Sequence, residues 1–198
     1  MSQAKVLSAT DTRKILIYIS SHKHAVRNRC MFLCTTQLGM RICEVANLKI
    51  ASVLNTDGSI RDEIHLSADQ TKGSKGRTII VSKKMQEEFK AYLQDRFQLK
   101  DLLAVTMTDT SRALFCNQKN YVRGFSNSTL CQTFHYIYKG AKVDGSSHSG
   151  RRGYITTLAN KGVGVRLIME LVGHKSMSVT QKYIDVNPTM LRSTAELI

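Results

Sequence analysis

Residues 146–162 read SSHSGRRGYITTLANKG, a polar start followed by helix-forming residues. Ser147 is suited to cap a helix whose first turns carry His148 and Arg151, which are three residues apart and therefore share one helix face. The free N–H groups of a helix start, together with an imidazole and a guanidinium, suit an oxyanion or a phosphate. A solvated basic helix start would show the same pattern, so both interpretations stay open at this point.

The next polar segment, residues 171–186, reads LVGHKSMSVTQKYIDV. Gly173 is expected to end a helix, His174 follows it directly, and Tyr183 comes nine residues later. The polar stretch between the histidine and the tyrosine has room for one short helix. Most tyrosines are packing residues with a satisfied hydroxyl, so Tyr183 alone does not identify a site.

The chain then continues as DVNPTMLRSTAELI to its last residue. Asn187 is suited to cap a final helix, and Pro188 suits the first position of that helix. Leu191, Ala195 and Ile198 form one apolar stripe along it. The stripe predicts a helix that either packs on its own domain or serves an interface.

The rest of the chain predicts mostly helices. They are expected over residues 11–20, 25–38, 83–97 and 129–139, and as short pieces in the last third. Ser8 and Asp11 form a capping-box pattern at the start of the first helix. Gly39 is suited to end the second, after which the segment RICEVANLKI (41–50) restarts a helix.

Two β-like runs, residues 60–66 and 77–81, are joined by the polar segment SADQTKGSKG (67–76). They predict a hairpin with a lysine-rich tip. A short apolar run, ALFC at residues 113–116, is expected to add a third strand. Because no linker, repeat or low-complexity tract divides the chain, we expect one domain over residues 1–198, mainly α with a small three-stranded antiparallel β-sheet.

Charge is the most informative part of the composition. The chain has 29 Lys and Arg against 15 Asp and Glu, a formal net charge of +14. Such a protein attracts polyanions, and nucleic acid is the leading partner. An anionic membrane surface is the alternative, but it favours basic residues on one amphipathic helix. Here Lys and Arg recur from Lys5 to Arg192, which favours nucleic acid.

Other classes of protein fit less well. No run of about 18 apolar residues is available for a membrane span. The first residues lack the apolar core of a signal peptide, so a cytoplasmic location at the nucleoid is expected. The five cysteines cannot all pair, and no Cys/His cluster has zinc spacing. We therefore expect reduced, mostly buried thiols, no metal and no cofactor.

Six residues in chain order carry a resemblance to a known family. They are Arg41 in GMRICEVANL, Lys72 in TKGSKGR, His148, Arg151, His174 and Tyr183. This set resembles the catalytic residues of the tyrosine recombinases, the phage integrase family, and the similarity runs from about residue 8 to residue 198. It implies the catalytic-domain fold of that family. Arg41 has an alternative, which is to pair with Glu44 on its own helix.

Most family members carry a separate helical core-binding domain ahead of the catalytic one. The chain is expected to lack it, as the short fimbrial-switch recombinases do, and to be a whole protein. Two positions depart from the family pattern: Arg152 stands where many members have histidine, and Gly150 where leucine is usual. These departures bear on local packing more than on chemistry.

The resemblance implies a type IB reaction that needs no metal and no ATP. Arg41 and Arg151 would bind the non-bridging oxygens of a phosphodiester, more tightly as negative charge develops there. Tyr183 would attack the phosphorus, form a 3′-phosphotyrosine and release a 5′-hydroxyl. A second 5′-hydroxyl can then attack this linkage and reseal the DNA.

The remaining roles concern protons. His148 and His174 would donate further hydrogen bonds or shuttle the proton of the tyrosine. Lys72, on the hairpin tip, is the candidate general acid for the leaving oxygen. Lys75 is the alternative, but Lys72 is favoured because it aligns with the lysine of the family.

The leading hypothesis is a site-specific DNA recombinase or integrase that acts on double-stranded DNA for integration, excision or inversion. One alternative is a type IB topoisomerase, and another is a DNA-binding regulator that has lost the reaction. The family also implies a tetramer on DNA, assembled through the C-terminal helix, and accessory DNA-bending proteins as further partners.

Overall fold

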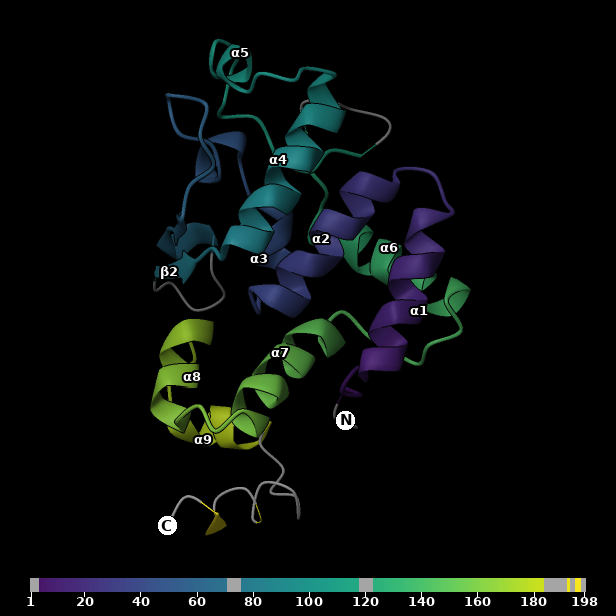
Figure 1. Ribbon diagram of the computed structural model, residues 1–198, viewed down its shortest axis with the longest axis vertical. Helices are drawn as coiled ribbons and strands as arrows, with labels where there is room; N and C mark the ends of the chain where they lie inside the picture. Colours follow the sequence, from purple (N-terminus) through teal and green to yellow (C-terminus); the bar gives the residue numbers. More distant parts are fainter. Residues whose placement is uncertain (1–3, 71–75, 118–122, 184–191, 193–194, 197–198) are drawn as a thin grey trace.

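The structure is a computed structural model that describes residues 4–70, 76–117, 123–183, 192 and 195–196. Helices dominate it, as the sequence predicts. In chain order the elements are α1 (Ala9–Ser20), α2 (Ala25–Gln37), α3 (Ile42–Ala46), η1 (Ile50–Ser52), β1 (Glu63–Leu66), η2 (Ala68–Gln70), β2 (Arg77–Ile80), α4 (Lys83–Phe97), α5 (Leu103–Thr106), α6 (Asn127–Gly140), α7 (Ser149–Asn160), α8 (Val165–Val172) and α9 (Met177–Gln181). Figure 1 shows α7, α8 and α9 together below a larger group formed by the preceding elements.

Helix α1 begins with the capping box that the sequence predicts. The Ser8 hydroxyl accepts a hydrogen bond from the N–H of Asp11 at 3.0 Å, and the Asp11 carboxylate accepts one from the N–H of Ser8 at 3.2 Å. This exchange satisfies two amide groups that a helix start leaves free. Ile15 and Ile19 on the inward face are buried, which fixes α1 against the core.

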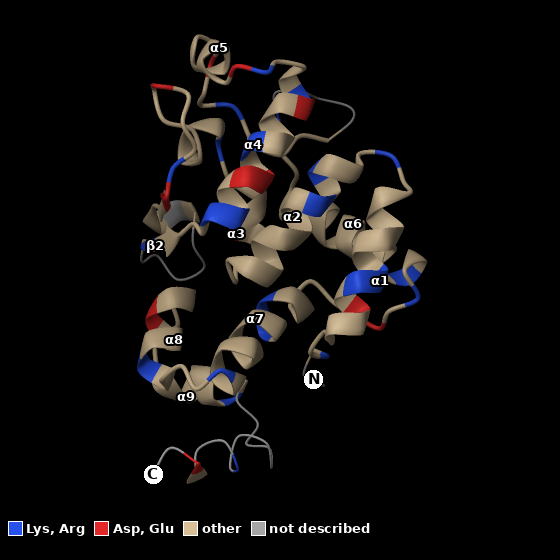
Figure 2. Cartoon of the chain, in the orientation of Figure 1, with Lys and Arg blue, Asp and Glu red and all other residues tan. Residues whose placement is uncertain are grey.

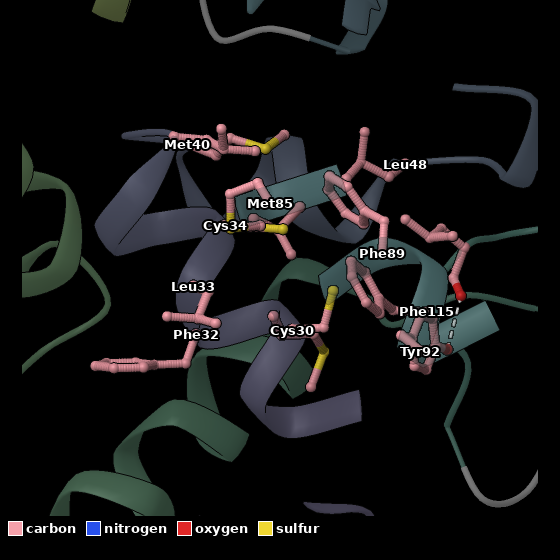
Figure 3. Packing of buried hydrophobic residues seen from close by; sticks show 14 of the residues in the cluster. Cys30, Phe32, Leu33, Cys34, Met40, Leu48, Met85, Phe89, Tyr92 and Phe115 are labelled. Atoms are coloured by element: carbon pink, nitrogen blue, oxygen red, sulfur yellow. Dashed lines mark hydrogen bonds between the residues drawn. The ribbon is translucent and has the colours of Figure 1, made fainter. Parts of the chain in front are cut away.

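Helix α2 lies at the centre of the larger group, where it contacts α1, α4 and α7. Residues 30–35 of this helix are all buried, as expected of a helix enclosed by its neighbours. Figure 3 shows Cys30 and Cys34 of α2 in one apolar cluster with Met85 and Phe89 of α4. All five cysteines are free thiols, and three are buried, which confirms the sequence prediction.

Strands β1 and β2 form the antiparallel hairpin expected from the sequence. Glu63 lies opposite Ile80, and Leu66 lies opposite Arg77. Residues 71–75, which include the lysine-rich tip, lie outside the described residues. The hairpin therefore places Arg77 at the base of the connection, at the start of β2.

The predicted third strand at residues 113–116 is wrong, because the sheet has two strands among the residues that the structure describes. The run makes isolated bridges only, from Ala113 to Lys49 and from Cys116 to Gly124. The chain after Lys49 turns at once into η1. The pairing therefore has no strand along which to continue.

Helices α7 and α8 form a second, smaller apolar cluster. Its buried members are Ile155, Ala159, Ile168 and Val172, and Tyr183 packs against them. Helix α7 also contacts α2, so it joins the two groups of helices. The predicted nucleophile therefore sits in the smaller group, and α7 connects it to the larger one.

Helix α7 begins at Ser149, and the expected cap by Ser147 is wrong. The N-cap position is His148, and it has no side-chain capping bond. Instead, the Ser149 hydroxyl accepts from the N–H of Ser146 at 3.0 Å, and the N–H of Ser149 donates to the Ser146 carbonyl at 2.9 Å. This closed turn replaces the capping bond that the sequence suggested.

Gly150 lies where α7 crosses α2, and the crossing explains its departure from the family pattern. A Cβ at this position would collide with Oγ1 of the buried Thr35. We expect Gly150→Ala to lower the free energy of unfolding by about 1–3 kcal/mol, the usual cost of overpacking. The measurement is urea unfolding followed by circular dichroism.

Gly153, one turn further along α7, supplies the matched control. The nearest atom to a Cβ there is the Leu7 carbonyl oxygen at 3.8 Å. Gly153→Ala is expected to raise the free energy of unfolding by up to about 1 kcal/mol, because alanine is the better helix former. Equal effects of the two substitutions would contradict the packing argument.

Basic residues are distributed over both groups of helices. Figure 2 shows Lys and Arg on α1, α2, α4 and α7. Within the described residues, no helix combines the length and the apolar character needed to cross a bilayer. Nor do three or more His, Cys, Asp or Glu side chains gather into a potential metal site in residues 4–70, 76–117 and 123–183.

Candidate active site

Arg41 occupies the N-cap of α3, directly after a tight turn. Gly39 in that turn has φ of 60°, and a Cβ there would lie 2.5 Å from Cδ1 of Tyr154. The position therefore needs glycine on two grounds. The Arg41 side chain donates from Nη1 to Oε1 of Glu44 at 2.8 Å, so the alternative pairing is present. It also donates from Nη2 to the carbonyl of Gly173 at 3.4 Å, which links α3 to the end of α8.

Arg151 lies in the first turn of α7 and is 4% exposed. Its Nη1 donates to the Gly39 carbonyl and its Nη2 to the Val172 carbonyl, both at 2.6 Å. Burial, followed by the neighbouring charge of Arg41, lowers the pKa of Arg151 to about 9. The guanidinium is therefore charged at neutral pH, and two carbonyls hold its plane in place.

His174 follows the left-handed Gly173 that ends α8. Its Nδ1 lies 2.9 Å from Oγ1 of Thr180. Burial lowers the pKa of His174 to about 4, and the positive charges of Arg151 and Arg41 act in the same direction. The imidazole is therefore neutral at physiological pH and can accept or donate a hydrogen bond without adding charge.

The Tyr183 ring packs against an imidazole and a guanidinium. Its ring stacks on His174 with centroids 5.5 Å apart, and Cζ of Arg152 lies 5.6 Å from the same ring. The Thr156 hydroxyl donates to the Tyr183 carbonyl at 3.1 Å. A pocket of about 330 Å³ opens beside the tyrosine, and its lining includes His148 and Arg152. The phenol ring is therefore held at the edge of a basic pocket.

The structure brings five of the six predicted site residues to the region around the carboxyl end of α8. They are Arg41, His148, Arg151, His174 and Tyr183. The lining of the pocket includes His148 and Tyr183 but neither Arg41 nor Arg151, which contact the end of α8 instead. Lys72, the predicted general acid, and the alternative Lys75 lie outside the described residues.

Sequence reasoning missed Arg77 and treated Glu44 only as a partner of Arg41. Arg77 donates to both Glu44 oxygens, from Nε at 3.3 Å and from Nη2 at 2.7 Å. Burial opposes ionisation of Glu44, but the bonds from Arg77 and Arg41 outweigh it, so the pKa of this carboxyl lies below its ordinary value. Strand β2 has no pattern that singles out its arginine, so this role was not visible in the sequence.

The low pKa of His174 leads to a pH prediction. In the free protein we expect the His174 imidazole to titrate near pH 4, below its ordinary value of 6.5. As pH falls from 6.5 towards 4, the His174 imidazole binds a proton in the unfolded chain but stays neutral in the folded chain. The free energy of unfolding therefore falls through this window. Histidine resonances followed by NMR across this range measure the midpoint.

The same titration in denaturant is the control, because the pKa of His174 should then return towards about 6.5. A midpoint for folded His174 at or above the ordinary value would contradict its placement among the arginines.

Comparison with known proteins gives a consistent result. The Phage integrase family model matches residues 5–190. Tyrosine recombinase XerA of Pyrococcus furiosus is 28% identical over 193 residues, which is 97% of this chain and 61% of the relative. Tyrosine recombinase XerC of Lactobacillus leichmannii is 28% identical over 173 residues, or 86% of this chain and 54% of the relative. The chain thus spans at most 61% of the length of these two curated relatives.

Solved structures share the fold. The crystal structure of XerA recombinase has a TM-score of 0.75 at 23% identity, covering 100% of this chain and 66% of that one. XerH site-specific recombinase bound to palindromic difH substrate, in a post-cleavage complex, has a TM-score of 0.72 at 22% identity, covering 98% and 53%. The architecture is therefore the tyrosine recombinase catalytic fold. Since the family model covers almost all of the sequence, the chain belongs to the phage integrase family.

Proposed function

We propose that the protein is a site-specific recombinase that cuts and rejoins double-stranded DNA through a 3′-phosphotyrosine. The observation that carries the proposal is the position of Tyr183, stacked on the neutral His174 beside the end of α8, where Arg41 and Arg151 are held. Fixed guanidinium groups near a phenol suit a phosphodiester that gains charge during attack. The net charge of +14 supports DNA as the partner.

The arginines would bind the phosphate. A guanidinium has five N–H donors in a rigid fork. Arg151 uses two of them on carbonyls within the described chain, which fixes the direction of the others. Arg41 is more accessible, with 20% of its side chain exposed, and it lies at the same helix end. Together they would hold the two non-bridging oxygens and stabilise the charge that develops there.

The tyrosine would supply the nucleophile. The Tyr183 oxygen forms a bond to phosphorus, the bond from phosphorus to the 5′ oxygen breaks, and the phenolic proton passes to His174 or His148. Lys72 gives its proton to the leaving 5′ oxygen, which departs as a hydroxyl. One phosphate ester replaces another, so a second 5′-hydroxyl can reverse the step and reseal a strand without ATP.

Assembly would follow the family pattern. We propose that four copies assemble on two DNA sites through residues 188–198, acting at the nucleoid with accessory DNA-bending proteins. Nearly all of these residues lie outside the described part of the chain. Deletion of residues 188–198 is expected to leave DNA cleavage unchanged and to abolish strand exchange. Unfolding of the shortened chain would instead favour a helix packed on its own domain.

The test of the function is a trapped covalent adduct. The full chain is incubated with a pool of nicked duplexes of randomised sequence, from which the short cleaved fragment diffuses away and prevents resealing. We expect a protein–DNA band on denaturing electrophoresis, with the nucleotide attached to Tyr183 in the digested peptide. The absence of any adduct would overturn the proposal. Relaxation of a plasmid without recombinants would favour the topoisomerase alternative.

A further inference from the structure

Three arginine side chains meet at the carboxyl end of α8. They donate to consecutive carbonyls: Arg77 to Leu171 at 2.7 Å, Arg151 to Val172 at 2.6 Å and Arg41 to Gly173 at 3.4 Å. The last carbonyls of a helix have no donor within the helix and carry partial negative charge. The end of α8 therefore gathers cations from β2, α7 and the start of α3.

Arg77 differs from Arg41 because all of its donors are directed into the protein. Its Nε and Nη2 donate to Glu44 and its Nη1 to Leu171, so every nitrogen of the guanidinium has a partner. The Arg77 side chain is 7% exposed, whereas that of Arg41 is 20% exposed. Arg77 is therefore bound within the protein rather than presented to a substrate.

Glu44 is the anion that Arg41 and Arg77 share. Its side chain is 0% exposed, and its Oε1 accepts from both guanidinium groups. A buried carboxylate of this kind requires a counter-charge. With Arg77 present, one cation offsets Glu44 and the charge of Arg41 remains available. Without Arg77, Glu44 and Arg41 would form an ion pair with no net charge.

The backbone of α8 is shaped around this contact. Gly173 has φ of 63°, and a Cβ at this position would lie 2.5 Å from Cδ of Arg77. The stem of Arg77 thus passes directly over the residue that precedes His174. The close approach needs glycine, and it ties β2 to the helix end that carries the histidine.

We propose that Arg77 is a positioning residue that offsets the charge of Glu44 and thereby leaves the charge of Arg41 available for the substrate phosphate. This inference rests on the proposed function. It predicts that the loss of Arg77 is harmful mainly because Glu44 remains charged. Removal of that charge should therefore restore activity.

The test compares single-turnover cleavage by the full chain, using one nicked duplex that the wild-type protein converts to adduct. We expect Arg77→Met to slow cleavage at least 100-fold. The double variant Arg77→Met/Glu44→Gln should cleave at least tenfold faster than Arg77→Met, as in a double-mutant cycle. Arg77→Lys retains the positive charge and should stay within about tenfold of wild type. Recovery by the double variant and by lysine would not occur if Arg77 only supported the fold.

Arg29 provides a matched control outside the site. It forms a two-point ion pair with Glu88, with bonds of 2.8 and 2.5 Å. Arg29→Met therefore removes the same charge and a two-point pair at a more exposed position, and cleavage should change less than threefold. A loss equal to that of Arg77→Met would show that net charge alone sets the rate.

Thermal unfolding is measured for every variant. If Arg77→Met does not fold, the double variant carries the test, and a rate within tenfold of wild type supports the proposal. Cleavage by Arg77→Met at the wild-type rate, or a folded double variant no faster than the folded single one, would overturn it. Failure of the wild-type chain to form an adduct would instead count against the proposed function.

Discussion

Tyr183→Phe is expected to abolish the covalent protein–DNA adduct, with a fall in cleavage rate of about 10⁴-fold or more, as for the loss of a nucleophile. The substitution removes one oxygen and keeps the ring that stacks on His174 at 5.5 Å and lies under Arg152. Packing should therefore change little, and the loss should appear in chemistry. Quantified denaturing gels of the nicked-duplex reaction measure it.

Tyr136→Phe is the control for this substitution. Tyr136 lies on α6 and is 66% exposed, so the same change of one oxygen falls on a surface side chain. Its cleavage rate should equal that of the wild type. DNA affinity of Tyr183→Phe, measured by gel shift, should also stay close to the wild-type value. An adduct that persists in Tyr183→Phe would identify a different nucleophile.

Arg151→Lys is expected to lower the cleavage rate by about 10²–10³-fold, the usual cost of losing one donor to a developing oxyanion. Arg151 reaches two carbonyls in different parts of the chain, those of Gly39 and Val172, through separate nitrogens. A lysine has one nitrogen and cannot reproduce this fork while also reaching a phosphate. Burial would in addition lower the pKa of the new amine. Single-turnover cleavage measures the effect.

Arg29→Lys makes the same exchange at a site away from α8. Its ion pair with Glu88 is partly exposed, so a lysine can replace it with little change in cleavage. Circular dichroism is measured for both variants, because Arg151→Lys also loses carbonyl contacts that support the fold. A folded Arg151→Lys protein that cleaves within tenfold of wild type would show that the fork geometry is not used.

Local patterns in the sequence predicted most of the elements. The capping box at Ser8 depends on residues three apart, and the hairpin of β1 and β2 depends on alternation and a polar connection. Such signals are complete within a few residues. The run at 113–116 failed as a third strand because its partner, Lys49, comes from a distant segment that turns away after a single bridge. No local pattern reports the length of a partner strand.

The candidate site likewise has features that local sequence predicts and features that depend on distant segments. The ordered residues Arg41, His148, Arg151, His174 and Tyr183 were named from the sequence, and the structure brings them to one region. Their environments were not foreseen. The pKa of His174, lowered to about 4, depends first on burial and then on arginines from elements far away in the chain. Sequence spacing contains no information about these charges.

The sequence by itself determined the family, the basic character and the order of the chemical groups, because these are properties of residue identity along the chain. Only the tertiary structure decided that Arg41 and Arg77 pair with Glu44 and that Arg152 lines the pocket beside Tyr183. It placed Arg77, Arg151 and Arg41 on the carbonyls of Leu171, Val172 and Gly173. The physical reason is that a helix end and a buried carboxylate attract any cation within reach, and the packing of β2, α3 and α7 around α8 sets which cations are within reach.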